Sequence, residues 1–380
     1  METNDECKEF YKTELKTKLE EIEKERLVFD NKMKRDRKKG VIVALGIAVL
    51  FSIGVQAMQE EGGLIDFLKG FAIFAPVLSL FGWILGSHFA MKKMLKLKKP
   101  FKEKIIAPII QHFDSELEYQ ADKSISKAEI KESQLFQEKI DYYTGDDFFE
   151  GKISNVKYRF SEKRLGIKIK KPDSQGHMKY VSHAIFKGVF LIAEFPENIL
   201  DTFIIRPNPE FKEEDNQRRL VQKRSKFQQE FAKNKYTHWF SHNVETSKDL
   251  KPIKTNDSYF DEQFLVYSNE EREAKSLLNS GLKDFLIKLT NWEKEKAFNA
   301  KIEGHLQGNY QYPTVYFSII GNKVYFGKPF DKHFFNPDLF KSILDEEVII
   351  EFYQEIKELQ LLMEKLILCI HQETPSSQDS

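Results

Sequence analysis

The stretch Tyr142–Glu162, YYTGDDFFEGKISNVKYRFSE, gathers acidic side chains that could take part in a reaction. A glycine is followed by two adjacent carboxylates, Asp146 and Asp147, and Glu150 and Glu162 lie in the same stretch. Neighbouring carboxylates can serve as general acid and base when a metal, a nucleophile or a second acidic pair joins them. The stretch is therefore the first candidate for a reaction centre.

A turn is the interpretation that we favour for these residues. The glycine and the aspartates stand where a helical pattern gives way to a strand pattern. Asp side chains at such points commonly bond to nearby backbone amides. We expect Asp146 and Asp147 to lie in a turn, and we keep as the alternative an enzyme that uses an acidic site around Asp146, Asp147 and Glu162. No catalytic residue, metal ligand or cofactor is assigned.

Other signatures of catalysis are missing from the sequence. It contains no GxxxxGK[ST], HExxH, GxSxG or CxxC motif, which are the marks of P-loop, zincin, hydrolase and thioredoxin-type chemistry. His238 and His242 have a zinc-binding spacing, with Glu245 one turn later, but nothing that flanks them resembles a metal helix. Cys7 and Cys369 stand at opposite ends of the chain, which excludes a disulfide framework and fits a reducing compartment.

Two apolar windows interrupt a polar chain. Residues 41–58 and 70–91 contain no Asp, Glu, Lys or Arg. At ~1.5 Å per residue they are about 27 and 33 Å long, which brackets the ~30 Å hydrocarbon core of a bilayer. We predict a transmembrane hairpin over residues 40–91 rather than a signal peptide, because some 40 charged and polar residues precede the first window.

Basic clusters flank the two windows on their outer sides. The loop between the windows holds Glu60, Glu61 and Asp66 against Lys69. Clustered positive charge resists translocation, so both chain termini are expected in the cytoplasm. The same cations are expected to attract anionic lipid head groups. The membrane-surface residues assigned on this basis are Lys34, Arg35, Arg37, Lys38, Lys39, Lys92, Lys93, Lys96, Lys98 and Lys99.

Gly82, Gly86 and Ala90 recur at four-residue spacing in the second window. Small residues at this spacing form a smooth face that another helix can approach closely. The simplest partner is the first window, through Ala44 and Ala48, and dimerisation through the glycines is the alternative.

Helical patterns occupy both ends of the chain. Residues 1–39 form a charged helix with a weak apolar seam, which would pair either with another chain or with the protein's own domain. Residues 345–370 carry an unbroken heptad pattern, and a widened apolar stripe favours docking onto the domain over a free coiled coil. The tail, residues 371–380, is expected to be disordered.

Residues 92–370 form the soluble body. A helical start is followed by strand-like runs separated by Gly, Pro, Asp and Ser, which predict a mostly antiparallel sheet flanked by helices, an α+β domain. Residues 208–258 are charged and poor in aliphatic side chains, and we interpret them as a basic insertion. Near the end of the body, Gly321 and Asn322 separate two aromatic, β-branched runs and predict a two-residue hairpin turn.

Several of these segments resemble a bacterial membrane family, domain of unknown function 3137. Order, spacing and the preceding apolar hairpin are also similar. The resemblance implies the bacterial inner membrane, and a LemA-type membrane protein as partner; residues 208–258 are longer than the family pattern. The resembling segments are Ser133–Glu162, Ala184–Asn208, Phe260–Leu278 and Val315–Ser342.

The sequence therefore predicts a multi-pass protein of the cytoplasmic membrane with an α+β domain on its cytoplasmic face. We expect that domain to act as a non-enzymatic binding or scaffold module, with a membrane protein, itself or anionic lipid as partner. Equal numbers of basic and acidic residues, 59 of each, give no overall field for nucleic acid. A membrane-tethered enzyme and a carrier of lipids or small molecules are the alternatives.

Overall fold

The computed structural model describes residues 2–57, 63–136, 140–172, 176–208, 250–278, 281–290, 315–330 and 335–371. The chain divides into two compact units, one helical and one built around a sheet. The helical unit consists of Met1–Phe113 and Phe335–Glu355, and the sheet unit consists of Asp114–Phe334 and Ile356–Ser380. Most of the predicted insertion, including His238, His242 and Glu245, lies outside the described residues, as does nearly all of the predicted C-terminal tail.

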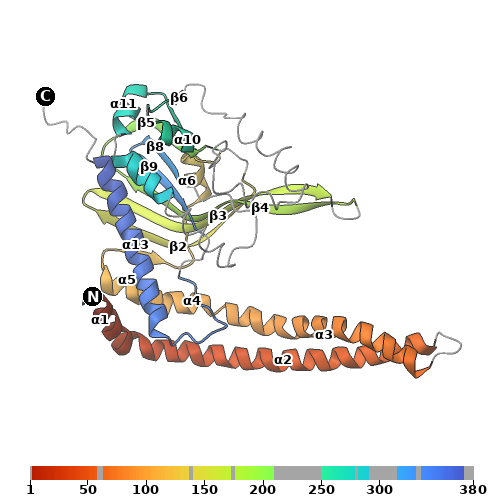
Figure 1. Ribbon diagram of the computed structural model, residues 1–380. Helices are drawn as coiled ribbons and strands as arrows, with labels where there is room; N and C mark the ends of the chain where they lie inside the picture. The colour runs from red at the N-terminus through yellow and green to blue at the C-terminus, as the bar shows by residue number, and fades with distance from the viewer. Residues whose placement is uncertain are drawn as a thin grey trace, which may run out of the picture. The chain divides into compact units, whose positions relative to one another are not determined.

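A long helical hairpin dominates the helical unit (Figure 1). The charged N-terminal segment and the first apolar window form one continuous helical run, so the chain does not break between them. The second helix lies alongside the first. The bounds are α1 Glu2–Phe10, η1 Tyr11–Leu15, α2 Lys16–Ala57 and α3 Leu64–Leu95.

Small residues let the backbones of α2 and α3 approach closely. Gly82 of α3 lies against Gly40 of α2, and Gly86 lies against the carbonyl group of Asp36. Ala44 and Ala48 are buried in the same seam. A helix pair without large side chains at the contact can pack at short range, and its large residues then point outward.

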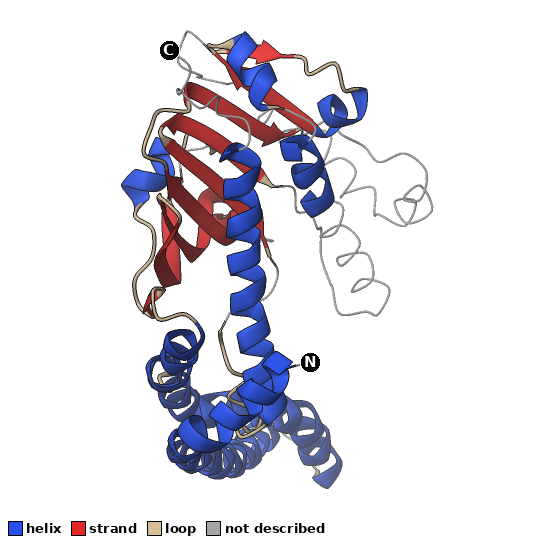
Figure 2. Ribbon diagram, turned by 90° about the vertical axis from the view of Figure 1, so that its left-hand side faces the viewer, coloured by secondary structure: helices blue, strands red, loops and turns tan. Residues whose placement is uncertain are grey.

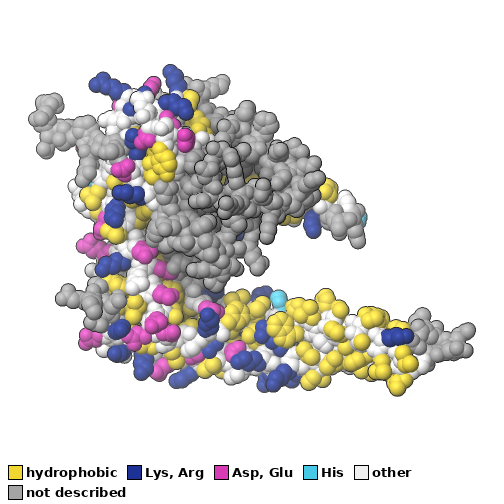
Figure 3. Space-filling model, viewed as in Figure 1, with side chains coloured by type: hydrophobic (Ala, Val, Ile, Leu, Met, Phe, Trp, Pro, Cys, Tyr) yellow, Lys and Arg dark blue, Asp and Glu magenta, His cyan; other side chains and the backbone are white. Residues whose placement is uncertain are grey.

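The large apolar side chains of the hairpin are exposed to a degree unusual for a folded protein. Figure 3 shows them covering the hairpin. In the most apolar stretches of the two helices only 17% and 11% of residues are buried. Both helices are long and apolar enough to cross a membrane. More than half of the side chain is exposed at Ile42, Val43, Leu50, Phe51, Ile73, Leu80, Phe81 and Leu85.

The base of the helical unit has a core of its own. It is built from the N-terminal seam, three short helical turns and the start of the last helix, where Phe101 meets Phe352 with ring centroids 5.7 Å apart. Leu15, Leu19 and Ile22 are buried, so this seam is covered by the protein's own chain. The remaining elements are α4 Lys98–Phe101, η2 Lys102–Ile106, α5 Ala107–Phe113 and α13 Glu346–His371.

The sheet unit contains a single antiparallel sheet, nine-stranded over the described residues, in the order β1-β2-β3-β4-β9-β8-β5-β7-β6 (Figure 2). The predicted antiparallel sheet with flanking helices is thus confirmed. The strands are β1 Glu118–Gln120, β2 Tyr142–Ile153, β3 Val156–Pro172, β4 Met178–Glu194, β5 Leu200–Pro207, β6 Lys251–Ile253, β7 Phe264–Ser268, β8 Tyr316–Gly321 and β9 Lys323–Pro329. The short helices are α6 Lys127–Glu132, α10 Ser258–Gln263 and α11 Glu271–Leu277, and residues 281–290 are also helical.

Helices and loops cover the sheet and close its core. The C-terminal half of α13 lies over one face (Figure 2), with His371 against Phe195 and its heptad positions from Ile356 to Ile370 buried. The opposite side holds a cluster that includes Leu165, Phe190, Ile204 and Tyr325. Docking of the last helix onto the protein, predicted from its wide stripe, is confirmed.

Two turns show how well local signals located the strands. The predicted hairpin is confirmed, because Ile320 pairs with Lys323 across the Gly321–Asn322 turn and Gly321 has φ +63°. The run KISNVKYRF, whose β-branched and aromatic residues suit a single strand, instead turns at Ser154, whose φ is +53°, and divides between β2 and β3. Ser and Asn favour turns through local side-chain hydrogen bonds, and that signal outweighs the apolar residues around them.

Candidate functional site

The paired aspartates lie inside a strand, which corrects the prediction of a turn between a helix and a strand. Asp146 belongs to β2 and stands opposite Glu162 of β3. The pairing resumes only at Phe149, so the ladder is interrupted by a bulge. Asp147 occupies this bulge with φ +54°, a left-handed conformation that Asp tolerates better than most residues.

The bulge explains how two consecutive side chains reach the same place. In a regular strand neighbouring residues point to opposite faces. Here the backbone N–H of Asp147 leaves the β2–β3 ladder and donates to the carbonyl oxygen of Ala121 at 3.1 Å. The altered backbone brings the carboxylates of Asp146, Asp147 and Glu162 together, with oxygens within 4.8 Å of one another.

Burial gives this group, the acidic cluster Asp146–Asp147–Glu162, an unusual electrostatic setting. The exposed fraction of Asp147 is 1% and that of Glu162 is 6%. The hydroxyl of Tyr119, on β1, donates to Oδ1 of Asp147 at 2.5 Å. Burial and the negative charge of Asp147 both raise the pKa of Tyr119, so this phenol remains a proton donor. Charged groups this far from water require close partners.

Lys163 adds a buried amine beside the cluster. Its Nζ donates to Oγ of Ser124 and to the carbonyl oxygen of Ile125, both at 2.9 Å. Burial lowers its pKa to about 8, and the charge of Asp146 opposes that shift. An amine with a lowered pKa is one of the features that marks functional sites.

This arrangement could hold a hard cation or position a proton donor and acceptor. Carboxylate oxygens are the ligands preferred by Mg²⁺ and Ca²⁺. Glu150, which the sequence also offered, stands opposite Arg159 on β3 and is outside the acidic cluster. The spacing of the residues could have suggested the pair Asp146–Glu162, whereas the bulge and the contribution of Tyr119 and Lys163 carry no local sequence signal.

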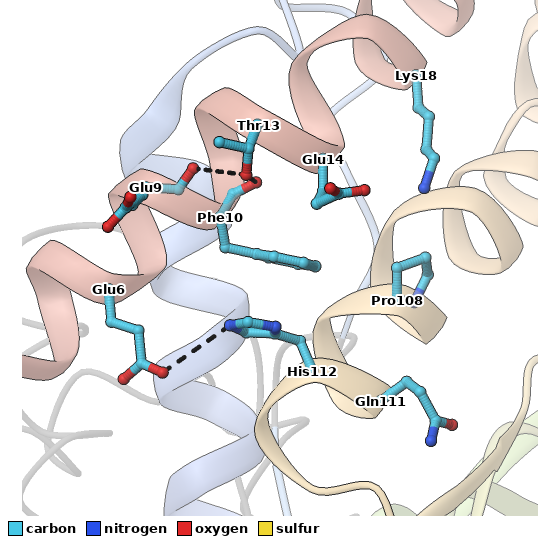
Figure 4. A pocket seen from close by; sticks show the side chains of 9 residues that line it. All are labelled: Glu6, Glu9, Phe10, Thr13, Glu14, Lys18, Pro108, Gln111 and His112. Carbon is cyan, nitrogen blue, oxygen red and sulfur yellow. Dashed lines mark hydrogen bonds and ion pairs between the residues drawn. The ribbon is translucent and has the colours of Figure 1, made fainter.

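A shallow groove in the helical unit is a second concave feature (Figure 4). It has a volume of about 570 Å³ and lies between the N-terminal helix and α5. The rings of Phe10 and His112 stack at 4.0 Å across it, and Glu6 lies 3.9 Å from Nε2 of His112. These contacts join two helices, and we interpret the groove as a packing feature. Its lining residues are Glu6, Glu9, Phe10, Thr13, Glu14, Lys18, Pro108, Gln111 and His112.

The residues assigned to helix packing lie within the hairpin. Gly82 and Gly86 contact α2 of the same chain, and Ala90 is fully buried. The structure therefore uses this face inside one chain, which is the simpler of the two partners that the sequence offered.

The basic residues assigned to the membrane surface gather at one end of the hairpin. Because Gly86 lies against Asp36, residues 34–39 of α2 run alongside the last turns of α3. Most of these cations are exposed, and Arg37 lies over the Trp83 ring at 4.3 Å. Their ion pairs are local, as between Lys34 and Asp30 at 2.7 Å.

Fold and site together define a protein with an antiparallel sheet unit joined to an apolar helical hairpin. Residues 184–368 match the family described as "Protein of unknown function (DUF3137)", which confirms the predicted resemblance over that part of the chain. No curated protein is significantly similar to the chain. Among solved structures, the mycobacterial trehalose monomycolate transport factor A, TtfA, is similar at 8% identity and a TM-score of 0.24, over 70% of this chain and 94% of that one. A likeness at that level supports no argument about function.

Proposed function

We propose that the protein is anchored in the bacterial cytoplasmic membrane by the α2–α3 hairpin and presents its sheet unit in the cytoplasm as a non-enzymatic binding or scaffold module. The observation that carries this proposal is the exposure of the hairpin's large apolar side chains around a seam of small ones. In water, each such side chain left exposed forgoes roughly 1.5–3 kcal/mol of burial free energy. A bilayer removes that cost.

The dimensions of the hairpin suit this role. From Gly40 to Ala57 α2 rises about 27 Å, and the apolar part of α3 is about 33 Å long, at ~1.5 Å per residue. Core helices of soluble proteins are mostly buried, unlike these two. The hairpin satisfies its own backbone hydrogen bonds, as a membrane span must.

The register of the hairpin supports the proposed orientation. Both basic clusters are at the same end, while the connecting loop carries Glu60, Glu61 and Asp66 against Lys69. Positive residues near membrane spans remain on the cytoplasmic side. Both chain termini and the sheet unit would then face the cytoplasm, where a LemA-type membrane protein, a second copy or anionic lipid could bind.

Cysteine accessibility in intact cells tests the anchoring and its orientation. In a Cys7→Ser, Cys369→Ser background, Gly63→Cys in the connecting region should react with a membrane-impermeant maleimide. Lys38→Cys and Lys152→Cys should react only after the cells are opened. Carbonate washing should leave the protein in the membrane fraction. Release by carbonate, or labelling of Lys152→Cys in intact cells, would refute the proposal.

Purification of the tagged full-length protein in mild detergent tests the scaffold role. Mass spectrometry should find a membrane protein or a second copy at stoichiometric yield. Recovery of a defined metabolite or metal ion instead, lost in an Asp146→Asn, Asp147→Asn variant, would overturn the scaffold role in favour of the acidic cluster.

The convergence of Asp146, Asp147 and Glu162 favours a membrane-tethered enzyme as the second candidate function. Their oxygens lie within 4.8 Å of one another and two of the residues are buried, the geometry in which a divalent cation would offset mutual repulsion. Titration calorimetry with Mg²⁺, Mn²⁺ and Ca²⁺ tests it. Binding should disappear in the double variant Asp146→Asn, Asp147→Asn and persist in the control double variant Glu118→Gln, Glu150→Gln. Equal heats of binding for the wild type and both variants would reject the enzyme as a candidate function.

A further inference from the structure

Strands β3 and β4 continue past the rest of the sheet as a two-stranded ribbon. Pairing of β3 with β2 ends at Gly166, and pairing of β4 with β9 begins at Gly188. Between these points residues 167–172 pair with residues 178–183 and with no other strand of the described sheet (Figure 1). We call this ribbon the β-arm. At ~3.3 Å per residue it extends about 15–20 Å beyond its neighbours.

The β-arm and its base are strongly basic. The sequence from 164 to 187 contains six Lys or Arg residues and one acidic residue, Asp173, in a chain whose total charge is zero. The side chains of Lys168, Lys170 and Lys179 are exposed. Local charge of this density attracts anionic partners. The six are Arg164, Lys168, Lys170, Lys171, Lys179 and Lys187.

Exposed apolar side chains accompany the cations. Met178 is 62% exposed and Tyr180 is 65% exposed. Cross-strand partners share a face, and the register pairs Lys170 with Tyr180, so that the Lys170 ammonium lies 5.3 Å from the Tyr180 ring. A surface that combines lysines with tyrosine and methionine suits the boundary between water and lipid, where amphipathic rings and long cationic chains are favoured.

Protection against aggregation accounts for only part of this pattern. Lysines on exposed strands discourage pairing with other chains. That role does not explain why the large side chains of Met178 and Tyr180 are exposed to water. Two-stranded ribbons are also only marginally stable alone, so a long one that lacks covering elements in the described sheet gains by resting on a surface.

We propose that the β-arm binds anionic phospholipid head groups of the membrane in which the hairpin is anchored. The inference rests on the anchoring proposed above. Only the short helices α4, η2 and α5 separate the end of α3 from Asp114, where the sheet unit begins. This short connection tethers the sheet unit to the membrane anchor and raises the effective concentration of lipid head groups around the β-arm. Each lysine near an anionic surface strengthens attachment about fivefold. The same tether disfavours nucleic acid, the other polyanion that this surface could accept.

Hydroxyl-radical footprinting of the full-length protein in nanodiscs tests the proposal. Discs of pure phosphatidylcholine are compared with discs that contain phosphatidylglycerol. Modification of Met178 and Tyr180 should fall several-fold in the anionic discs, while Tyr259, which is 49% exposed in α10, should react equally in both. High salt should reverse the protection.

Two charge-matched variants separate the β-arm from general charge effects. Lys168→Glu, Lys170→Glu, Lys179→Glu should lose the protection. Lys152→Glu, Lys157→Glu, Lys251→Glu changes three other exposed lysines of the same sheet and should retain it. Because all six side chains are exposed, both variants are expected to fold.

The remaining outcomes each decide against the proposal in a different way. Equal labelling of Met178 in both kinds of disc, with the protein resistant to carbonate, would overturn the lipid contact and leave the anchor intact. Extraction of the protein from the discs by carbonate would refute both the anchoring by the hairpin and the lipid binding by the β-arm. Protection by duplex DNA in phosphatidylcholine discs, without any effect of phosphatidylglycerol, would assign the β-arm to nucleic acid.

Discussion

Gly82 of α3 and Gly40 of α2 lie back to back, each with its backbone where the other's side chain would be. A β-carbon added to either glycine would come closer than 3.0 Å to the carbonyl oxygen of the other. Such a contact leaves no room for any side chain larger than hydrogen. The pairing of the two helices therefore depends on these positions rather than on large interlocking side chains.

Replacing Gly82 with Leu is expected to force α2 and α3 of the hairpin apart. Overpacking a close contact costs about 1–3 kcal/mol, and here the clash is with backbone, which yields little. The thermal unfolding midpoint in detergent should fall. Gly46→Leu and Gly54→Leu are matched controls, because a β-carbon added at either position meets nothing within 4 Å. If Gly82→Leu matches these controls, the close packing is not what holds the hairpin.

The small-residue seam also shows what the sequence could predict. Spacing alone identified Gly82 and Gly86 as a packing face, and the turn at Gly321 followed from the residue types that tolerate positive φ. Both signals are local, so they are readable along the chain. The apolar windows and the final heptad are local in the same sense, which is why the helices that contain them were predicted well.

The acidic cluster could not be predicted because it depends on long-range contacts. Nothing in the neighbourhood of Asp147 indicates that its N–H will donate to Ala121, and without that contact the strand would alternate and separate Asp146 from Asp147. Arg26 is a second example. It interrupts an apolar seam in the sequence, yet it is buried with Glu23 and donates to the carbonyl oxygen of Leu339, far along the chain.

Removing the Arg26 guanidinium is expected to destabilise the helical unit. Arg26 donates from Nη2 to Glu23 Oε1 at 2.6 Å and from Nε to Oε2 at 2.7 Å. Arg26→Met would leave a buried carboxylate without its cation, at a cost of about 3–5 kcal/mol. Chemical denaturation measures the loss. Lys24→Met, at an exposed position of the same helix, should change the free energy of unfolding by less than about 0.5 kcal/mol.

The ion pair between Arg26 and Glu23 should also affect how the free energy of unfolding falls at acid pH. Burial alone would raise the pKa of Glu23, but hydrogen bonds from Arg26 and from the Ile343 N–H lower it below the usual 4.5. A lowered pKa contributes stability that is complete above the unfolded value and is lost as the pH falls through the folded value. This acid loss should shrink in Arg26→Met. An unchanged acid limb would contradict the assignment.

Truncating Phe352 is expected to damage the base of the helical unit. Its ring meets Phe101 at 5.7 Å and Phe335 at 6.5 Å between centroids. Removing a buried phenyl group typically costs 3–5 kcal/mol, so Phe352→Ala should lower the unfolding midpoint clearly. Leu361→Ala on the same helix, where 47% of the side chain is exposed, should have a much smaller effect. Equal decreases in the unfolding midpoint for the two variants would mean that the apolar face of α13 is not buried.

Lys163 should give the sheet unit a distinctive dependence on alkaline pH. Its pKa is about 8 in the folded protein, lowered from 10.5 by burial. Between these two values the unfolded chain holds a proton that the folded chain has released. The free energy of unfolding contributed by this group therefore rises with pH across that window, and below it the contribution is constant.

Replacing Lys163 with Met should flatten that rise. The measurement is the free energy of unfolding from denaturant titrations between pH 7.5 and 10.5, read as a slope, because the variant also strips a donor from Ser124 and Ile125 and its overall stability will change. Lys157→Met, exposed on the same strand, controls for loss of a positive charge and should keep the wild-type slope. If Lys163→Met also keeps the wild-type slope, the Lys163 amine is not the group that titrates in this range. The conclusion that burial beside the acidic cluster lowers its pKa would then be wrong.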